Sequence, residues 1–173
     1  MISKNTRLQD VLKLAPPCKC HACSHPCTMG SGFLAHSDLT PIAKFLGLTE
    51  KELKENHLEE VEMFNKTFFR PKLHRKDGKP YGKCTFYDNL KGCTIHPVKP
   101  LQCKTSMGCS PYGDHLSAWF VLNHLVDTDD PEAVRQYAQY LKNGGTKISG
   151  GELHEIVEDK EKLRKMLSYE HLL

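Results

Sequence analysis

Eight cysteines are the residues of this 173-residue chain that are best suited to chemistry. Four of them fall within ten consecutive positions, at Cys18, Cys20, Cys23 and Cys27. Their C-x-C-x2-C-x3-C spacing contains a C-x2-C pair, in which a tight turn can bring two sulfurs to one ion while backbone amides donate hydrogen bonds to them. This first group predicts a metal site, and His21 and His25 are alternative ligands beside it.

The second group of cysteines comprises Cys84, Cys93, Cys103 and Cys109. Glycines and prolines lie among them, which predicts loops bent to aim sulfurs inward. Two groups of four match two four-coordinate sites or two cluster sites, and a single site with ligands from both groups is a further alternative. The sequence leaves the pairing open, together with a ligand role for His96.

The surroundings of the cysteines favour metal ligation over disulfides. The N-terminal stretch mixes charged and apolar residues without the apolar core of a secretory signal, and no run of about eighteen apolar residues could span a membrane. We therefore expect a soluble, cytoplasmic protein with no membrane partner. In a reducing compartment, clustered thiols are typical of metal or redox sites. Thiolates suit zinc, iron and iron–sulfur clusters alike, so we expect zinc or iron as the cofactor.

An enzymatic role is left open by the sequence. A thiolate beside an imidazole can act as a nucleophile, but clustering indicates that these thiols are occupied. No carboxylate or histidine is placed as an unambiguous general base, so catalytic residues remain unassigned. The formal net charge of +3 counts neutral thiols. Because metal-bound cysteines are thiolates, this charge is weak support for a nucleic-acid partner.

The elements that must position the cysteines are mostly helical. Periodicity and capping signals predict helices over 6–14, from Thr40–Pro41 to Gly47, over 114–126, over 131–142, and in an amphipathic tail from 152. A further helix is predicted to begin at a Thr49/Glu52 capping box, with the glutamates up to position 62 on its solvated face. Short strands are expected at 67–70 and 84–87, joined through the turn-rich segment 76–82.

These patterns predict a mostly helical α+β fold, a single small domain over 1–173 with loops that converge on a cysteine-ligated metal centre. Within it, 18–109 is the expected metal-binding region and 110–173 a C-terminal helical region. The segment 66–83 carries seven basic residues with aromatic residues nearby. We expect a solvated basic hairpin there, and contact with nucleic acid is the alternative.

The region 18–109 resembles the YkgJ-like (CxxCxxCC) cysteine-cluster family of zinc- or iron-chelating proteins. The resemblance is carried by the C-x2-C pair Cys20/Cys23, the segment SDLTPIAKFLGLTEKEL, and the later motifs GKCTFY, GCTIH and VKPLQC. The chain departs from the family pattern in three places. Cys27 stands four positions after Cys23, where the family has adjacent cysteines, His96 replaces an aromatic residue, and Lys99 replaces an arginine.

The resemblance implies metal binding and says little about a reaction. A related cysteine pattern in flagellin lysine methylases, which are associated with an iron–sulfur cluster, makes such a cluster credible here, although this chain has no recognisable glycine-rich site for a methyl donor. Two functions follow as hypotheses. One is an iron or iron–sulfur centre with a redox or modification role, and the other is a structural zinc module that binds nucleic acid or a protein partner through 66–83.

Overall fold

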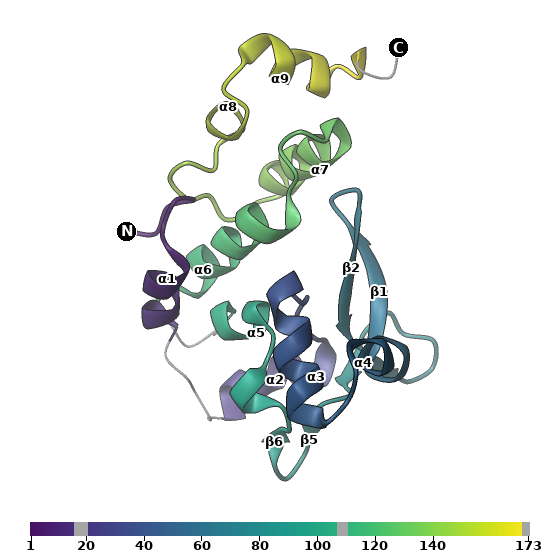
Figure 1. Ribbon diagram of the computed structural model, residues 1–173. Helices are drawn as coiled ribbons and strands as arrows, with labels where there is room; N and C mark the ends of the chain where they lie inside the picture. The colour runs from purple at the N-terminus through teal and green to yellow at the C-terminus, as the bar shows by residue number, and fades with distance from the viewer. Residues whose placement is uncertain (16–20, 107–110, 171–173) are drawn as a thin grey trace.

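The computed structural model describes residues 1–15, 21–106 and 111–170, with the backbone alone for 21–23. Helices precede and follow an uninterrupted run of short strands that pair two by two in antiparallel fashion, which confirms the predicted mostly helical α+β class. Figure 1 shows one half built from α2 to α5 and the strands, and another half built from α1 and α6 to α9. In the described part of the chain, no helix combines the length and apolar character needed to cross a membrane.

The half that contains all the described cysteines has its own cluster of buried residues. Its helices are α2 (His21–Met29), α3 (Leu39–Leu46), α4 (Glu50–His57) and α5 (Leu101–Thr105), with short 3-10 turns at His36–Asp38 and His96–Val98. The cluster comprises Leu34, Leu39, Ile42, Ala43, Leu53, Leu58, Cys84, Phe86 and Ile95. A thiol therefore belongs to this apolar core.

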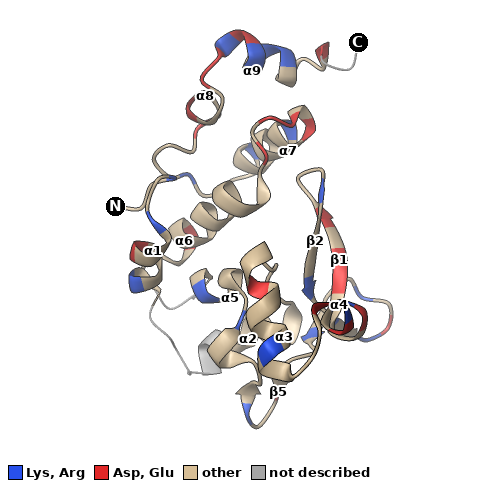
Figure 2. Ribbon diagram, in the orientation of Figure 1, with Lys and Arg blue, Asp and Glu red and all other residues tan. Residues whose placement is uncertain are grey.

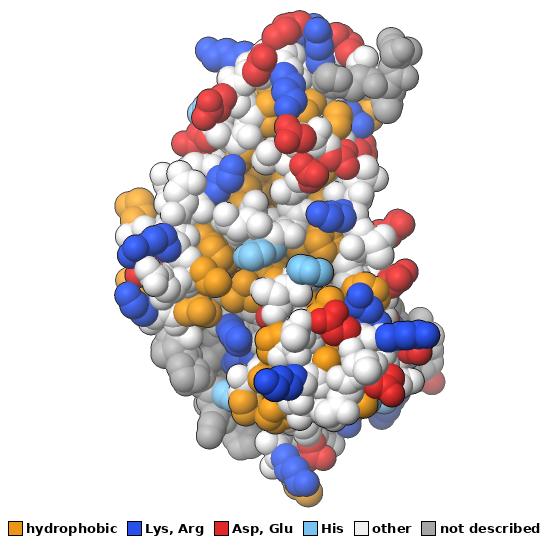
Figure 3. Space-filling model, viewed as in Figure 1, with side chains coloured by type: hydrophobic (Ala, Val, Ile, Leu, Met, Phe, Trp, Pro, Cys, Tyr) orange, Lys and Arg blue, Asp and Glu red, His pale blue; other side chains and the backbone are white. Residues whose placement is uncertain are grey.

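The second half consists of helices around a larger apolar cluster. Its elements are α1 (Leu8–Leu14), α6 (Gly113–Phe120) continued by a π-helical turn (Val121–Leu125), α7 (Pro131–Lys142), α8 (Leu153–Ile156) and α9 (Lys160–Leu167). Phe120, Leu116, Val134 and Tyr137 are almost fully buried there. Figure 3 shows charged side chains crowded over the end formed by α8 and α9, and apolar side chains exposed across the middle of the same face.

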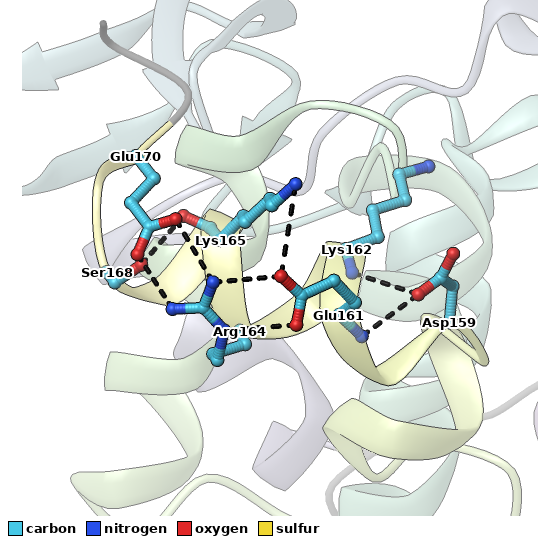
Figure 4. A network of polar contacts seen from close by, with 7 residues as sticks. All are labelled: Asp159, Glu161, Lys162, Arg164, Lys165, Ser168 and Glu170. Carbon is cyan, nitrogen blue, oxygen red and sulfur yellow. Dashed lines mark hydrogen bonds and ion pairs between the residues drawn. The ribbon is translucent and has the colours of Figure 1, made fainter.

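A polar network holds the C-terminal helix (Figure 4). Asp159 accepts hydrogen bonds from the backbone amides of Glu161 and Lys162, at 2.9 and 3.0 Å, and so caps α9. Arg164 pairs with Glu161 and Glu170. These contacts stabilise the first turn of α9 and connect its last turn to the residues that follow.

Several predicted helix boundaries are confirmed. The Thr49/Glu52 capping box opens α4, and Gly47 ends α3 at a φ of 68°. Asp130 caps α7, whose bounds are those predicted. Thr40 does not cap α3, because the chain enters that helix from the preceding 3-10 turn and the helix begins at Leu39.

The predicted continuation of α4 through the glutamates to position 62 is wrong. Strand β1 (Leu58–Met63) replaces it and pairs antiparallel with β2 (Lys66–Pro71). Phe64 and Asn65 form the two-residue turn with φ values of 50° and 57°, the left-handed conformation of a tight hairpin. Figure 2 shows the acidic residues along β1, and Glu59 lies opposite Arg70. Pairing across the hairpin offsets the loss of helical hydrogen bonds.

The strands predicted at 67–70 and 84–87 exist, but they do not pair with each other. The first lies in β2, and the second is divided between β4 (Gly82–Cys84) and β5 (Tyr87–Asp88). β4 pairs with β3 (Leu73–Arg75), and β5 pairs with β6 (Gly92–Cys93). The turn-rich segment therefore connects β3 to β4, a shorter hairpin than expected.

Candidate metal centre

Four cysteines from four different elements line a single cavity of about 600 Å³. They are Cys27 on α2, Cys84 at the end of β4, Cys93 on β6 and Cys103 on α5. One comes from the first group in the sequence and three come from the second. Of the open alternatives, the geometry favours a site with ligands from both groups. Cys18, Cys20 and Cys109 lie outside the described residues, as does the side chain of Cys23.

Two strand pairs position Cys84 and Cys93. Leu73 lies opposite Cys84 in the β3–β4 ladder, and the amide of Thr85 donates to the carbonyl of Lys72 at 2.9 Å. The β5–β6 hairpin places Cys93 opposite Tyr87. These ladders fix the backbone at both cysteines, so the sulfur positions depend on side-chain rotation alone.

A buried carboxylate positions the helix that carries Cys103. Asp38 is 7% exposed, and its Oδ2 accepts hydrogen bonds from the amides of Ala35, at 2.8 Å, and Leu101, at 2.9 Å. Burial raises the pKa of Asp38, and the two amides offset part of this effect. Gln102 also accepts a hydrogen bond from the amide of Phe33. The first turn of α5 is thereby joined to the segment that follows α2.

Backbone amides point at three of the sulfurs. Those of Phe86 and Tyr87 hydrogen-bond Cys84, that of Ile95 hydrogen-bonds Cys93, and that of Gly32 hydrogen-bonds Cys103. Amide donors stabilise a thiolate and tune the metal that it binds. The donor set therefore fits a thiolate-bound metal or cluster.

Burial disfavours the ionised form of these thiols in the absence of a bound cation. It raises the pKa of Cys84 to about 11 and that of Cys103 to about 12, and neighbouring thiolates add to the rise. It also raises the pKa of Cys27 and Cys93, while the ammonium of Lys99 opposes the shift at both. A cation among the sulfurs would reverse this preference. The four thiols are thus suited to ionise together with metal binding.

The four sulfurs share a cavity without converging on one point. Across the described residues, no group of three or more His, Cys, Asp and Glu side chains is arranged to hold a single metal ion. His96 and the lysines Lys91 and Lys99 line the cavity, and its described lining includes no Asp or Glu. His25 is exposed, and the side chain of His21 is outside the description.

The basic segment 66–83 is engaged within the protein at several positions. Glu59 pairs with Arg70 at 2.9 Å and with Arg75 at 2.6 Å, and Lys72 donates to the carbonyl of Glu55. Phe68 is 9% exposed and belongs to the core. These contacts favour the solvated hairpin over a surface for nucleic acid.

Three residues at this site were not predicted from the sequence. Asp38 and Gln102 hold α5, and Gly32 leaves room for the sulfur of Cys103, since a Cβ at Gly32 would lie 2.6 Å from it. Asp38 precedes a helix and resembles an ordinary cap in the sequence. Only the position of Gly32, soon after the first cysteine group, could have indicated its role.

The comparisons with known proteins point to the same chemistry. The family model CxxCxxCC, described as "Putative zinc- or iron-chelating domain", matches residues 19–121. This range contains all four cysteines that line the cavity. Searches of curated proteins and of solved structures found no match.

Proposed function

The chain belongs to the CxxCxxCC family of zinc- or iron-chelating domains, and from this premise we propose that its cavity holds an iron–sulfur cluster used in electron transfer. Cys27, Cys84, Cys93 and Cys103 are the ligands in this proposal. The remaining cysteines, Cys18, Cys20, Cys23 and Cys109, stay predicted metal ligands, with their site left open.

The observation that carries the proposal is a single cavity of about 600 Å³ that is lined by four cysteines from four different elements. A single zinc ion draws four sulfurs to one point, at about 2.3 Å each. In a cluster each thiolate binds its own iron or shares one with a single other thiolate, so the sulfurs lie further apart. The described side chains form no group suited to one ion, yet the four thiols share a cavity and influence one another electrostatically. A cavity of this volume has room for a cluster of several atoms, and this is our reason to propose a cluster and not a single zinc ion.

The residues of the chain would perform the remaining tasks. When bound, a cluster supplies a centre that gains and loses one electron. The amides of Gly32, Phe86 and Ile95 donate to sulfur, which favours the reduced state because they stabilise added negative charge. Lys99, close to Cys27 and Cys93, acts in the same direction.

Metal analysis of the full chain, purified without oxygen from cells supplied with iron and zinc, tests the proposal. We expect iron and acid-labile sulfide with a broad absorption band at about 400 nm. Cys84→Ser and Cys103→Ser should lose most of both, while Ser106→Ala, a change of another cavity-lining residue, should retain them. Colourless protein with stoichiometric zinc would contradict the proposal.

A further inference from the structure

We propose that the rim of the cavity is a docking surface for a small acidic electron-carrier protein, with Leu90 as its apolar anchor. The inference deepens the proposed function and rests on it, because an electron carrier needs a redox centre to serve. Three observations support this inference: Leu90 is exposed, the residues around the cavity are positively charged, and Leu90 and these residues lie close to a candidate ligand.

Leu90 is 97% exposed, the most exposed large apolar side chain after the N-terminal methionine in the described structure. It lies at the tip of the β5–β6 hairpin, which projects from one end of the molecule in Figure 1. The carboxylate of Asp88 accepts hydrogen bonds from the amides of Leu90 and Lys91, both at 2.8 Å. The turn is therefore held in one shape before binding, which lowers the entropy lost when a partner docks.

The charge around this leucine is positive. Lys91 is exposed and lines the cavity, and Lys99 lines it as well. Lys83 is close enough to Asp88 to lower the pKa of that carboxyl, after the larger effects of the two amides and alongside Lys91. The carboxylate of Asp88 is turned to the backbone amides of its own loop. An acidic protein surface is thus the complementary partner.

The location ties the surface to the proposed centre. Leu90 precedes the candidate ligand Cys93 by three positions, and both belong to one hairpin. A turn tip and a few lysines form a small contact area, which is typical of transient electron-transfer encounters. Positive charge would steer an acidic carrier to the rim of the cavity that the four cysteines line.

Calorimetric titration of the full chain with an acidic plant-type [2Fe–2S] ferredoxin tests the inference. We expect measurable binding at low ionic strength that weakens as salt is added, because exposed charges are screened. Leu90→Asp and the double variant Lys83→Glu/Lys91→Glu should each weaken binding at least tenfold. The matched controls Leu167→Asp and Lys142→Glu change exposed residues of the other half and should bind as the wild type does.

Two preparations separate this inference from the proposed function. The rim consists of side chains of the chain itself, so iron-loaded and zinc-loaded protein should both bind the ferredoxin. A protein that holds only zinc but shows Leu90-dependent binding would contradict the redox centre and support the docking surface. Absence of binding in both preparations, or binding unchanged in the rim variants, would overturn the docking surface.

Discussion

The buried carboxylate of Asp38 accepts a hydrogen bond from the backbone amide of Leu101, 63 positions later in the chain, at 2.9 Å. Leu101 begins α5, and Cys103 follows in the first turn of this short helix. The same oxygen accepts from the amide of Ala35. The Asp38 side chain therefore joins α5, which carries the candidate ligand Cys103, to the segment that follows α2, the helix that carries the candidate ligand Cys27.

Asp38→Ala should destabilise the metal-free protein by about 3 kcal/mol, because two buried amides lose their acceptor. Urea unfolding measures the change, and metal content should fall with it as Cys103 loses its position. Asp38→Asn retains an oxygen and should recover part of both. The control Asp10→Ala removes exposed ion pairs with Arg7 and Lys13, which are screened by solvent, and should change the stability little. Equal effects of the two alanine variants would contradict a positioning role for Asp38.

Gly32→Ala and Gly30→Ala form a matched pair at the cavity wall. A Cβ at Gly32 would lie 2.6 Å from the sulfur of Cys103 and 3.2 Å from its amide nitrogen, whereas a Cβ at Gly30 meets nothing closer than 3.9 Å. We expect Gly32→Ala to destabilise the protein by about 2 kcal/mol through overpacking and to lower metal content. Gly30→Ala should leave metal content unchanged. Metal content after anaerobic loading compares them, and equal retention would contradict the close packing of Gly32 on the sulfur.

Local signals account for the parts of the fold that could be predicted from the sequence. Asp130 and Pro131 begin α7, Gly47 ends α3, and Thr49 with Glu52 opens α4. Each signal acts within one turn of a helix, so neighbouring residues suffice to identify it. The strand β1 was missed because its glutamates also fit the exposed face of a helix, and its pairing with β2 depends on a turn at Phe64 and Asn65 that carries no glycine.

The candidate site divides in the same way. The residue types were predicted, since eight clustered thiols indicate a metal centre. The sequence left open which cysteines share a site, because the approach of Cys27 to the second group of cysteines depends on the long-range contacts of Asp38 and Gln102. Such contacts have no spacing rule in the sequence. Arg70 and Arg75 illustrate the same limit, because their partner Glu59 is on another strand.

Glu59 should make stability depend on pH below neutrality. Its pKa is lowered from 4.5 to about 2, chiefly by Arg75 and then by Arg70 against the opposing effect of burial. A depressed carboxyl pKa stabilises the folded state above the ordinary value, and this contribution is lost as the pH falls from about 4.5 towards 2. Solvent screening at this partly exposed cluster limits it to about 1 kcal/mol.

Glu59→Gln tests this contribution. The variant should be less stable than the wild type at pH 7, and the difference in unfolding free energy should shrink as the pH is lowered through that range. Denaturant unfolding across the range measures it, with the exposed neighbour Glu60→Gln as the control. A constant difference at all pH values would show that Glu59 acts by packing and not by charge.

The tip of the β1–β2 hairpin, at Phe64 and Asn65, connects the half with the candidate centre to the C-terminal helices. Asn65 donates to the carboxylate of Asp130 at 2.8 Å, and Asp130 also caps α7. Beside it, the ring of Phe64 packs against Tyr137 and Tyr140, with centroids 6.3 and 6.5 Å away. The β1–β2 hairpin thus reaches α7 through one polar and one aromatic contact, and the two can be separated by mutation.

A double-mutant cycle with Asn65→Gly and Asp130→Ala measures the polar contact. Glycine keeps the left-handed backbone of the turn, with φ at 57° in the wild type, and removes only the side-chain donor. Asp130→Ala should cost about 1 to 2 kcal/mol because the cap is lost as well. We expect a coupling energy of about 0.5 to 1 kcal/mol between the two positions. Asp159→Ala removes the equivalent cap of a different helix, α9, and should be additive with Asn65→Gly. Equal coupling in both pairs would mean that Asn65 acts on stability through the turn and not through α7.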